Sequence, residues 1–529
     1  MIQFKSVKKD LFIYFLFLII FYGIFRYSGT FARGYDIYDD QDVITANRSL
    51  ETNSFFSVFK DWLKIDSEAK MRFRPVGIFF FLATVKFIGF NIKLINIYLA
   101  FLCICTSFLL YKFCANIGLS VIQSVLFALL SLIGPATIMW IQPPTVVECI
   151  GMVLLSFSLF FLSKSIYSQK NLISYKLLFV ISLLLTMLCK ESFLVLTPAI
   201  LFLYIWIYSL KNNIGLIQSL KKNYIIIVFT SVFFLFFIFY IIKLVGVSSQ
   251  DYSGVDVDLF SVKMLKDFLE AVFNTGSIFV ILFGIIILIY GKFQKKHLST
   301  DNHKISISSF LIPFIIMLLI IVPQFILYYK SGFNQGRYYL PFLIGFSFFL
   351  IYILKVIFDS RSISTVIKYL FLSLIFVNLL FEIKTVTIPS LTKYSDRCKT
   401  TSEMLNSIVS IPNKKLMIVM DPVGNYQELI SIETYLDYLK EQIEFKYDFV
   451  KNSNLNKMFV NTPLGKGIEE YAYKKWGNKQ IDSTINNTDI RNILVFSGLN
   501  EKFLLKNIKW INENNYQKRF IGSFTLYSK

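Results

Sequence analysis

Long runs of apolar residues, separated by short polar stretches, dominate the first 388 residues of the chain. A helix that crosses a bilayer needs about 20 mostly apolar residues, and eleven runs approach that length. They cover residues 11–28, 93–114, 120–138, 145–163, 177–190, 193–210, 224–245, 277–291, 307–328, 338–357 and 367–387. The pattern therefore predicts a polytopic α-helical membrane protein with about eleven transmembrane helices.

A further apolar run, residues 76–90, is short and contains Lys86, so hydropathy alone does not decide whether it spans. The charge of the loops decides whether this run spans, because basic residues gather on the inner side of a membrane. With the N-terminus inside and residues 76–90 not spanning, every basic loop falls inside; these loops are 164–176, 211–222, 292–304 and 355–368. We therefore expect 76–90 to be an interfacial or re-entrant helix on the outer face, within a long first outer loop, 29–92.

Past Pro389 the apolar runs give way to the pattern of a soluble domain. The short runs LMIVM (416–420) and NILVF (492–496) are typical of buried strands, and residues 427–442 have helical spacing. FIGSFTLY (520–527) indicates an edge strand. The sequence thus predicts a transmembrane domain, 1–388, followed by a small α/β domain, 389–529, which the count of eleven spans places outside.

Composition agrees with this class. Of 529 residues, 55% are hydrophobic and 17% charged, and the mean hydropathy is +0.59, whereas soluble domains have roughly 45–50% apolar and about 25% charged residues. These values exclude a soluble enzyme with one core, a disordered chain and a coiled coil. The net charge of +20 lies largely in short loops, so it does not indicate nucleic-acid binding. Five of six cysteines lie in apolar runs, and no metal-type spacing occurs.

The first outer loop carries Tyr38-Asp39-Asp40-Gln41-Asp42, just past the first span. Three carboxylates within four residues repel one another unless a cation, an arginine or a shared proton offsets the repulsion. The arrangement suits a general base, or a set of ligands for a divalent cation, at the membrane face. The alternative is a solvated acidic turn. Asp36, slightly upstream, is expected on the surface.

Two sets of basic residues are candidates for binding phosphate. Arg72-Phe73-Arg74-Pro75 lies immediately before the run 76–90, and Arg337 lies at the outer end of the tenth span. Arginine binds phosphate through paired, charge-assisted hydrogen bonds. The alternative for all three residues is that they reach out of the bilayer towards lipid headgroups.

Glu148, Lys190 and Glu191 lie at the outer ends of predicted spans. Charges at membrane depth are costly, so they usually face a polar cavity or pair with each other. The predicted topology puts these three residues on the same side as Asp39 and Asp40. We interpret this as one site, with a purely structural Lys190–Glu191 pair as the alternative.

In this order the features resemble the GT-C superfamily of membrane glycosyltransferases, and within it the protein O-mannosyltransferase-like group. That group includes the transmembrane O-mannosyltransferases that carry tetratricopeptide repeats. The similar stretches are Tyr38-Asp39-Asp40 with Ile44 and Asn47, Arg72 to Pro75, Asn96, Pro144 with Glu148, and Cys189-Lys190-Glu191. The repeats are absent here, and Lys93 stands near a position where the family often has histidine.

The resemblance implies a GT-C-like fold and transfer of a sugar from a polyprenyl-phosphate-linked donor to a hydroxyl group of a cell-envelope acceptor, which is a protein, a lipid or a polysaccharide. The family's first-loop acidic residue acts as catalytic base, which corresponds here to Asp40 or Asp39. Substrate-binding candidates are Asp42, Arg72, Arg74, Glu148, Lys190, Glu191 and Arg337. No cofactor is expected, and a divalent cation held by the acidic turn is the open alternative.

Loop charge predicts that the N-terminus is in the cytoplasm, and the resemblance implies a reaction on the outer face of the cytoplasmic membrane. Residues 389–529 are expected to supply no catalytic residue and to cover the acceptor entrance, or to act as a structural cap. Alternative functions are a flippase or other transporter for lipid-linked oligosaccharides, a polysaccharide polymerase, or a scaffold. Transporters commonly have inverted repeats and charges near the bilayer midplane, and the sequence has neither.

Overall fold

The structure is a computed structural model that describes residues 2–69, 72–245, 262–273, 277–295, 307–328, 340–411, 414–421, 425–449, 463–477, 491–496, 499, 511–512, 515–521 and 524–528. The chain folds into two compact units. The membrane unit comprises Met1–Thr30, Phe55–Thr84 and Ile95–Thr392. The sheet unit comprises Phe31–Ser54, Val85–Leu94 and Lys393–Lys529.

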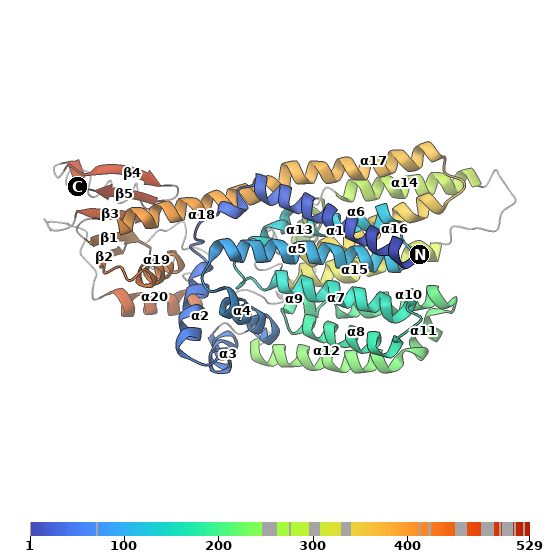
Figure 1. Cartoon of the computed structure of the whole chain (residues 1–529), viewed down its shortest axis with the longest axis horizontal. Helices are drawn as coiled ribbons and strands as arrows, with labels where there is room; N and C mark the ends of the chain where they lie inside the picture. The colour runs from blue at the N-terminus through green and yellow to red at the C-terminus, as the bar shows by residue number, and fades with distance from the viewer. Residues whose placement is uncertain are drawn as a thin grey trace. The chain divides into compact units, whose positions relative to one another are not determined.

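The membrane unit is built of helices, the longest of which run alongside one another (Figure 1). They are α1 (Ile2–Tyr27), α3 (Phe55–Lys64), most of α4 (Pro75–Ile88) and α5 (Ile92–Asn116), α6 (Val121–Leu132), α7 (Glu148–Tyr167), α8 (Leu172–Met187), α9 (Glu191–Leu194), α10 (Thr197–Asn212), α11 (Leu216–Lys222), α12 (Tyr224–Val245), α13 (Val262–Phe273), α14 (Ser277–Lys295), α15 (Ile307–Tyr328), α16 (Leu340–Asp359) and α17 (Thr365–Glu382). Short 3₁₀ or π turns are η1 (Thr30–Ala32), η2 (Ile65–Ala69), η3 (Pro135–Trp140) and η5 (Ile383–Thr387).

Eight helices of the described residues are long and apolar enough to cross a membrane. They contain Lys8–Tyr27, Ile92–Asn116, Glu148–Tyr167, Glu191–Asn212, Tyr224–Lys243, Phe310–Leu327, Leu340–Asp359 and Thr365–Val409. The other three predicted spans correspond to the shorter apolar helices α6, α8 and α14, and α4 is short as well. With its 12 residues, α6 rises only about 18 Å, less than the roughly 30 Å hydrocarbon core. The count of eleven spans therefore remains a prediction.

Burial differs sharply between the apolar helices. In α16, 83% of the most apolar window is buried, and this helix packs against α6, α14 and α15. In the most apolar part of α12 only 6% is buried, and side chains such as Phe229, Phe236 and Phe239 are exposed. A helix so apolar on its exposed sides is stable in lipid and not in water. The chain is therefore a multi-pass helical membrane protein, as its sequence predicts.

The sheet unit contains a five-stranded sheet with the strand order β2-β1-β3-β5-β4. Strands β1 (Lys415–Met420), β2 (Glu444–Phe449) and β3 (Asn492–Phe496) are parallel, and β4 (Gln517–Ile521) and β5 (Phe524–Ser528) are antiparallel additions. The helices are α2 (Asp40–Thr52), α18 (Ile388–Val409) from residue 393 onward, α19 (Tyr426–Tyr438) and α20 (Pro463–Trp476). The predicted small α/β fold is confirmed.

The strands at 416–420 and 492–496 and the helix near 427–442 are confirmed as β1, β3 and α19. The single edge strand predicted at 520–527 is wrong. This stretch is divided between β4, which is the edge, and β5, which lies between β3 and β4. β5 is apolar because it is buried on both sides, and a short apolar run does not reveal whether its strand is central or at the edge.

Part of the first loop folds into the core of the sheet unit. Tyr35, Ile37 and Ile44 are buried in the same cluster as Met404 of α18 and Leu429 of α19. Helix α2 packs against α19, and the Tyr35 hydroxyl group lies 2.8 Å from the hydroxyl group of Ser431. Residues just past the first span are thus fixed by residues about 400 positions later in the chain.

Candidate functional site

The acidic turn predicted from the sequence lies at the start of α2. Asp39 is the N-cap residue, and Asp40 and Asp42 lie in the first helical turn. Carboxylates are favoured there, because the unpaired backbone N–H groups give a helix N-terminus a partial positive charge. Asp39 and Asp42 are half-buried, whereas Asp40 is fully buried. Asp40 is therefore not part of a solvated turn, which was the alternative for this motif.

Asp40 has two differently placed carboxylate oxygens. Oδ2 accepts hydrogen bonds from Nη1 of Arg33, at 3.1 Å, and from the backbone N–H of Asp36, at 2.7 Å. Oδ1 is buried and has no hydrogen-bond partner among the described residues. Burial raises the pKa of Asp40 above its ordinary value of 3.8, and the charge of Arg33 opposes this shift only in part. The result is a fixed carboxylate with one oxygen unengaged.

Arg33 is the counter-ion of this carboxylate, and both side chains are fully buried. Burial by itself lowers the pKa of Arg33, but the charges of Asp40, Asp36 and their neighbours together outweigh this effect, so the pKa is raised overall. The guanidinium is therefore a permanent charge next to Asp40. Arg33 was not predicted as a site residue, although an arginine six positions before the first carboxylate of an acidic triplet is the kind of positive charge that such a triplet requires.

Asp36 is fully buried, so the expectation that it lies on the surface is wrong. Its Oδ1 accepts hydrogen bonds from Nη2 of Arg397, at 3.0 Å, and from the backbone N–H of Tyr38, at 3.2 Å. Its Oδ2 accepts a hydrogen bond from the hydroxyl group of Tyr394. These partners on α18 explain how a carboxylate can be buried here, because a buried charge requires paired and hydrogen-bonded neighbours. No local sequence signal links them to Asp36.

The membrane unit holds a second group of charges, the charged cluster, formed by Asp66, Arg74, Glu148, Lys190 and Glu191. Arg74 binds both carboxylate oxygens of Asp66, through Nε (3.2 Å) and Nη2. Lys190 forms an ion pair with Glu148, 42 positions away. The alternative considered from the sequence was a structural pair of Lys190 with its neighbour Glu191.

The start of α4 brings Arg74 towards Lys190 and Glu191. The backbone N–H of Val76 donates to the carbonyl oxygen of Leu188 at 3.2 Å. A Cβ on Gly77 would lie 2.8 Å from the Cys189 carbonyl oxygen, so only glycine allows this approach. The charges of Glu191 and Glu148 consequently act on Arg74. The sequence predicts one site for Glu148, Lys190 and Glu191 together with Asp39 and Asp40, whereas the approach of Arg74 and Asp66 to the first three residues was not predicted.

Arg72 and Arg337 are the other two residues predicted to bind phosphate. Arg72 is half-buried, and its backbone N–H donates to the carbonyl oxygen of Asp66 at 2.8 Å. Arg337 lies outside the described residues. Within the described ranges, no three His, Cys, Asp or Glu side chains converge as a metal site would require.

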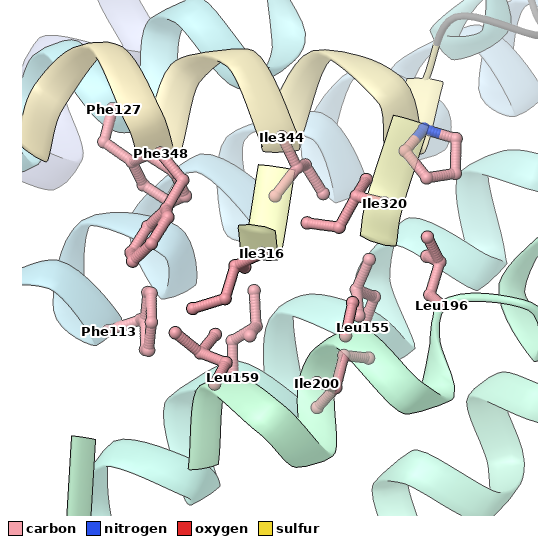
Figure 2. Close-up of a pocket in the computed structure, with 13 residues that line it drawn as sticks. Phe113, Phe127, Leu155, Leu159, Leu196, Ile200, Ile316, Ile320, Ile344 and Phe348 are labelled. Atoms are coloured by element: carbon pink, nitrogen blue, oxygen red, sulfur yellow. The ribbon is translucent and has the colours of Figure 1, made fainter. Parts of the chain in front are cut away.

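A cavity of about 20 Å³ lies between the helices of the membrane unit. Figure 2 shows apolar side chains around it, including Phe113, Leu159, Ile316 and Phe348. All of its lining residues are apolar, whereas a sugar or phosphate site requires hydrogen-bond donors and acceptors. The cavity is therefore a packing void and not a site for a sugar or a phosphate.

No protein-family model matches the chain, and no curated protein matches it. Among solved structures, the chain is similar to ArnT from Cupriavidus metallidurans bound to undecaprenyl phosphate, with a TM-score of 0.46, 9% identity and coverage of 97% of both chains. It is also similar to the Archaeoglobus fulgidus oligosaccharyltransferase tethered with an acceptor peptide, with a TM-score of 0.37, 10% identity and coverage of 86% of this chain and 65% of that chain. These likenesses are distant, and the function proposed below rests on the residues of this chain.

Proposed function

We propose that this chain is a membrane glycosyltransferase of the GT-C type. It moves a sugar from a polyprenyl-phosphate-linked donor to a hydroxyl group of a cell-envelope acceptor, which is a protein, a lipid or a polysaccharide. The observation that carries the proposal is the Asp40 carboxylate, which is buried against Arg33 with one oxygen unengaged, in a turn that resembles the first-loop motif of that superfamily. The protein O-mannosyltransferase-like assignment rests on the sequence motifs alone.

In the proposed reaction, Asp40 or Asp39 acts as the general base. The carboxylate takes the proton of the acceptor hydroxyl group, and the acceptor oxygen forms a bond with the anomeric carbon of the sugar. The bond between that carbon and the lipid phosphate oxygen breaks, and the phosphate leaves with the bonding electrons. The raised pKa of Asp40 supports this role, because a base works best when its pKa lies near the working pH. Asp39 has the advantage of being more accessible.

The proposed ligands of the leaving phosphate are Arg72, Arg74, Lys190 and Arg337. Arg74 binds Asp66 through Nε and Nη2, so we propose that its third guanidinium nitrogen, Nη1, binds a phosphate oxygen. Positive charge near the leaving oxygens stabilises the negative charge that develops in the transition state. We propose that Asp42, Glu148 and Glu191 contact the substrates as hydrogen-bond acceptors or orient these cations. No metal ion takes part in the proposed steps.

The direct test of the proposed function is donor-dependent transfer by the purified protein. Detergent-solubilised protein would be incubated with polyprenyl-phosphate donors carrying radiolabelled hexose or pentose, together with a cell-envelope extract from a strain lacking the protein. We expect label to enter an acceptor and free polyprenyl phosphate to appear in equal amount. Movement of intact donor across liposome membranes without transfer would instead support a flippase.

We further propose that the protein lies in the cytoplasmic membrane with its N-terminus in the cytoplasm and its acidic turn and C-terminus outside. The inward-facing basic loops implied by the eleven-span count support this orientation. Alkaline phosphatase fused after Lys529 should be active, and a fluorescent protein that folds only in the cytosol should stay dark at that position. The reverse result would mean that residues 76–90 span, or that another helix is miscounted.

A further inference from the structure

We propose that Tyr394 and Arg397 of α18 are positioning residues for the acidic turn, so that the C-terminal part of the chain takes part in the reaction. This inference rests on the proposed function, because it assigns the two residues a role in placing its catalytic base. It differs from the expectation that residues 389–529 only cover the acceptor entrance or act as a cap. The two residues do not touch the substrate in this proposal. They act through Asp36.

The loop that carries Asp36 fits closely against one face of α18. Cys398 and Ser402 follow Tyr394 at intervals of four residues, so the three side chains lie on one side of the helix. A Cβ on Gly34 would lie 2.2 Å from Oγ of Ser402 and 2.5 Å from the carbonyl oxygen of Cys398. The backbone N–H of Tyr35 donates to Oγ of Ser402 at 2.7 Å. The loop is thus held at a fixed position along α18, one residue before Asp36.

A continuous chain of hydrogen bonds runs from α18 to the proposed base. Arg397 and Tyr394 each donate to one oxygen of the Asp36 carboxylate. The backbone N–H of Asp36 then donates to Oδ2 of Asp40 at 2.7 Å. A shift of Asp36 therefore moves one of the two donors that orient the Asp40 carboxylate, and a displacement of about 1 Å can lower a rate about 100-fold.

The Arg397 side chain is 43% exposed, although its partner Asp36 is fully buried. The guanidinium lies 5.0 Å from the ring centroids of both Tyr38 and Tyr394, and these contacts restrict its orientation. Removing this arginine leaves the buried Asp36 carboxylate without its counter-ion. The change is therefore expected to shift the turn and also to lower the stability of the fold, so activity is compared at equal amounts of folded protein.

The experiment compares Arg397→Gln, Arg397→Lys and Tyr394→Phe with Lys399→Gln, a matched change at an exposed position of the same helix. We expect kcat for sugar transfer to fall about tenfold or more in Arg397→Gln and Tyr394→Phe, with the donor KM within about twofold of wild type. Arg397→Lys should recover part of the loss, because it restores the charge without the planar fork. Lys399→Gln should behave as wild type.

Wild-type kcat in both Arg397→Gln and Tyr394→Phe would overturn the inference, as would a loss of kcat that only follows the fraction of unfolded protein. Hydrogen–deuterium exchange tests the positioning role separately from the proposed function, because it does not depend on sugar transfer. If wild-type protein transfers no sugar, amides of residues 33–42 should still exchange faster in Arg397→Gln and Tyr394→Phe than in Lys399→Gln. Unchanged exchange would show that α18 does not position the turn.

Discussion

Replacing Asp40 with asparagine should lower kcat for sugar transfer by about 10²–10⁴-fold, the range that a general base contributes. Asparagine keeps the shape of the side chain but cannot take the proton of the acceptor hydroxyl group. The measurement is the rate of donor-dependent labelling, compared with that of Asp39→Asn. A large loss in Asp39→Asn alone would assign the base to Asp39, and full activity of the double variant would overturn the assignment of either residue.

The pH dependence of the wild-type enzyme gives a second measurement of the same prediction. A base must be deprotonated, so kcat/KM should rise with pH through the pKa of the catalytic carboxyl group. Because burial raises the pKa of Asp40 above 3.8, we expect this acidic limb above the ordinary range of aspartate. The limb should persist in Asp39→Asn if Asp40 is the base.

Replacing Arg33 with methionine should destabilise the protein by about 3–5 kcal/mol, because it leaves the Asp40 carboxylate buried without its counter-ion. The measurement is the free energy of unfolding of the sheet unit in detergent, followed by tryptophan fluorescence from Trp476, which is buried in that unit's core. In this variant the folded-state pKa of Asp40 should rise further. The folded form of Arg33→Met should therefore be most stable at low pH, where Asp40 is protonated and neutral. Its free energy of unfolding should fall as the pH rises through the folded-state pKa of Asp40.

The double variant Arg33→Met with Asp40→Leu is the control for the prediction that Asp40 is the base and for the prediction that Arg33→Met is unstable. Replacing a buried ion pair by apolar side chains of similar size is often neutral for stability. We therefore expect the double variant to regain most of the stability lost in Arg33→Met and yet to transfer no sugar. Restored transfer would exclude Asp40 as the base, and an unrecovered loss of stability would mean that the pair has a further structural role.

The class of fold could be predicted because one physical constraint governs membrane helices. Backbone groups in lipid must bond within their own segment, so runs such as 224–245 and 338–357 predict α12 and α16 without knowledge of their neighbours. The strands β1 and β3 are predictable for a related reason, since central parallel strands are continuously apolar. By contrast, the length of α6 depends on Pro135, Gly134 and their packing, which a hydropathy average does not resolve.

The candidate site was predictable only in part. The crowding of Asp39, Asp40 and Asp42 is visible in the sequence, because like charges close together require an explanation. Their partners are not visible, because an ion pair depends on spatial contact and not on spacing along the chain. The bonds of Asp36 to Tyr394 and Arg397, and of Glu148 to Lys190, join segments that are brought together only by the fold.

The hydrogen bond between Asp36 and Tyr394 joins residues 358 positions apart, and this separation has a consequence for biosynthesis. At about 5–20 residues per second, a ribosome needs roughly 20–70 s to advance from one residue to the other. During that interval Asp36 has been synthesised while its partners on α18 do not yet exist. The turn that carries the proposed base therefore acquires its final form late, when most of the chain has already been made.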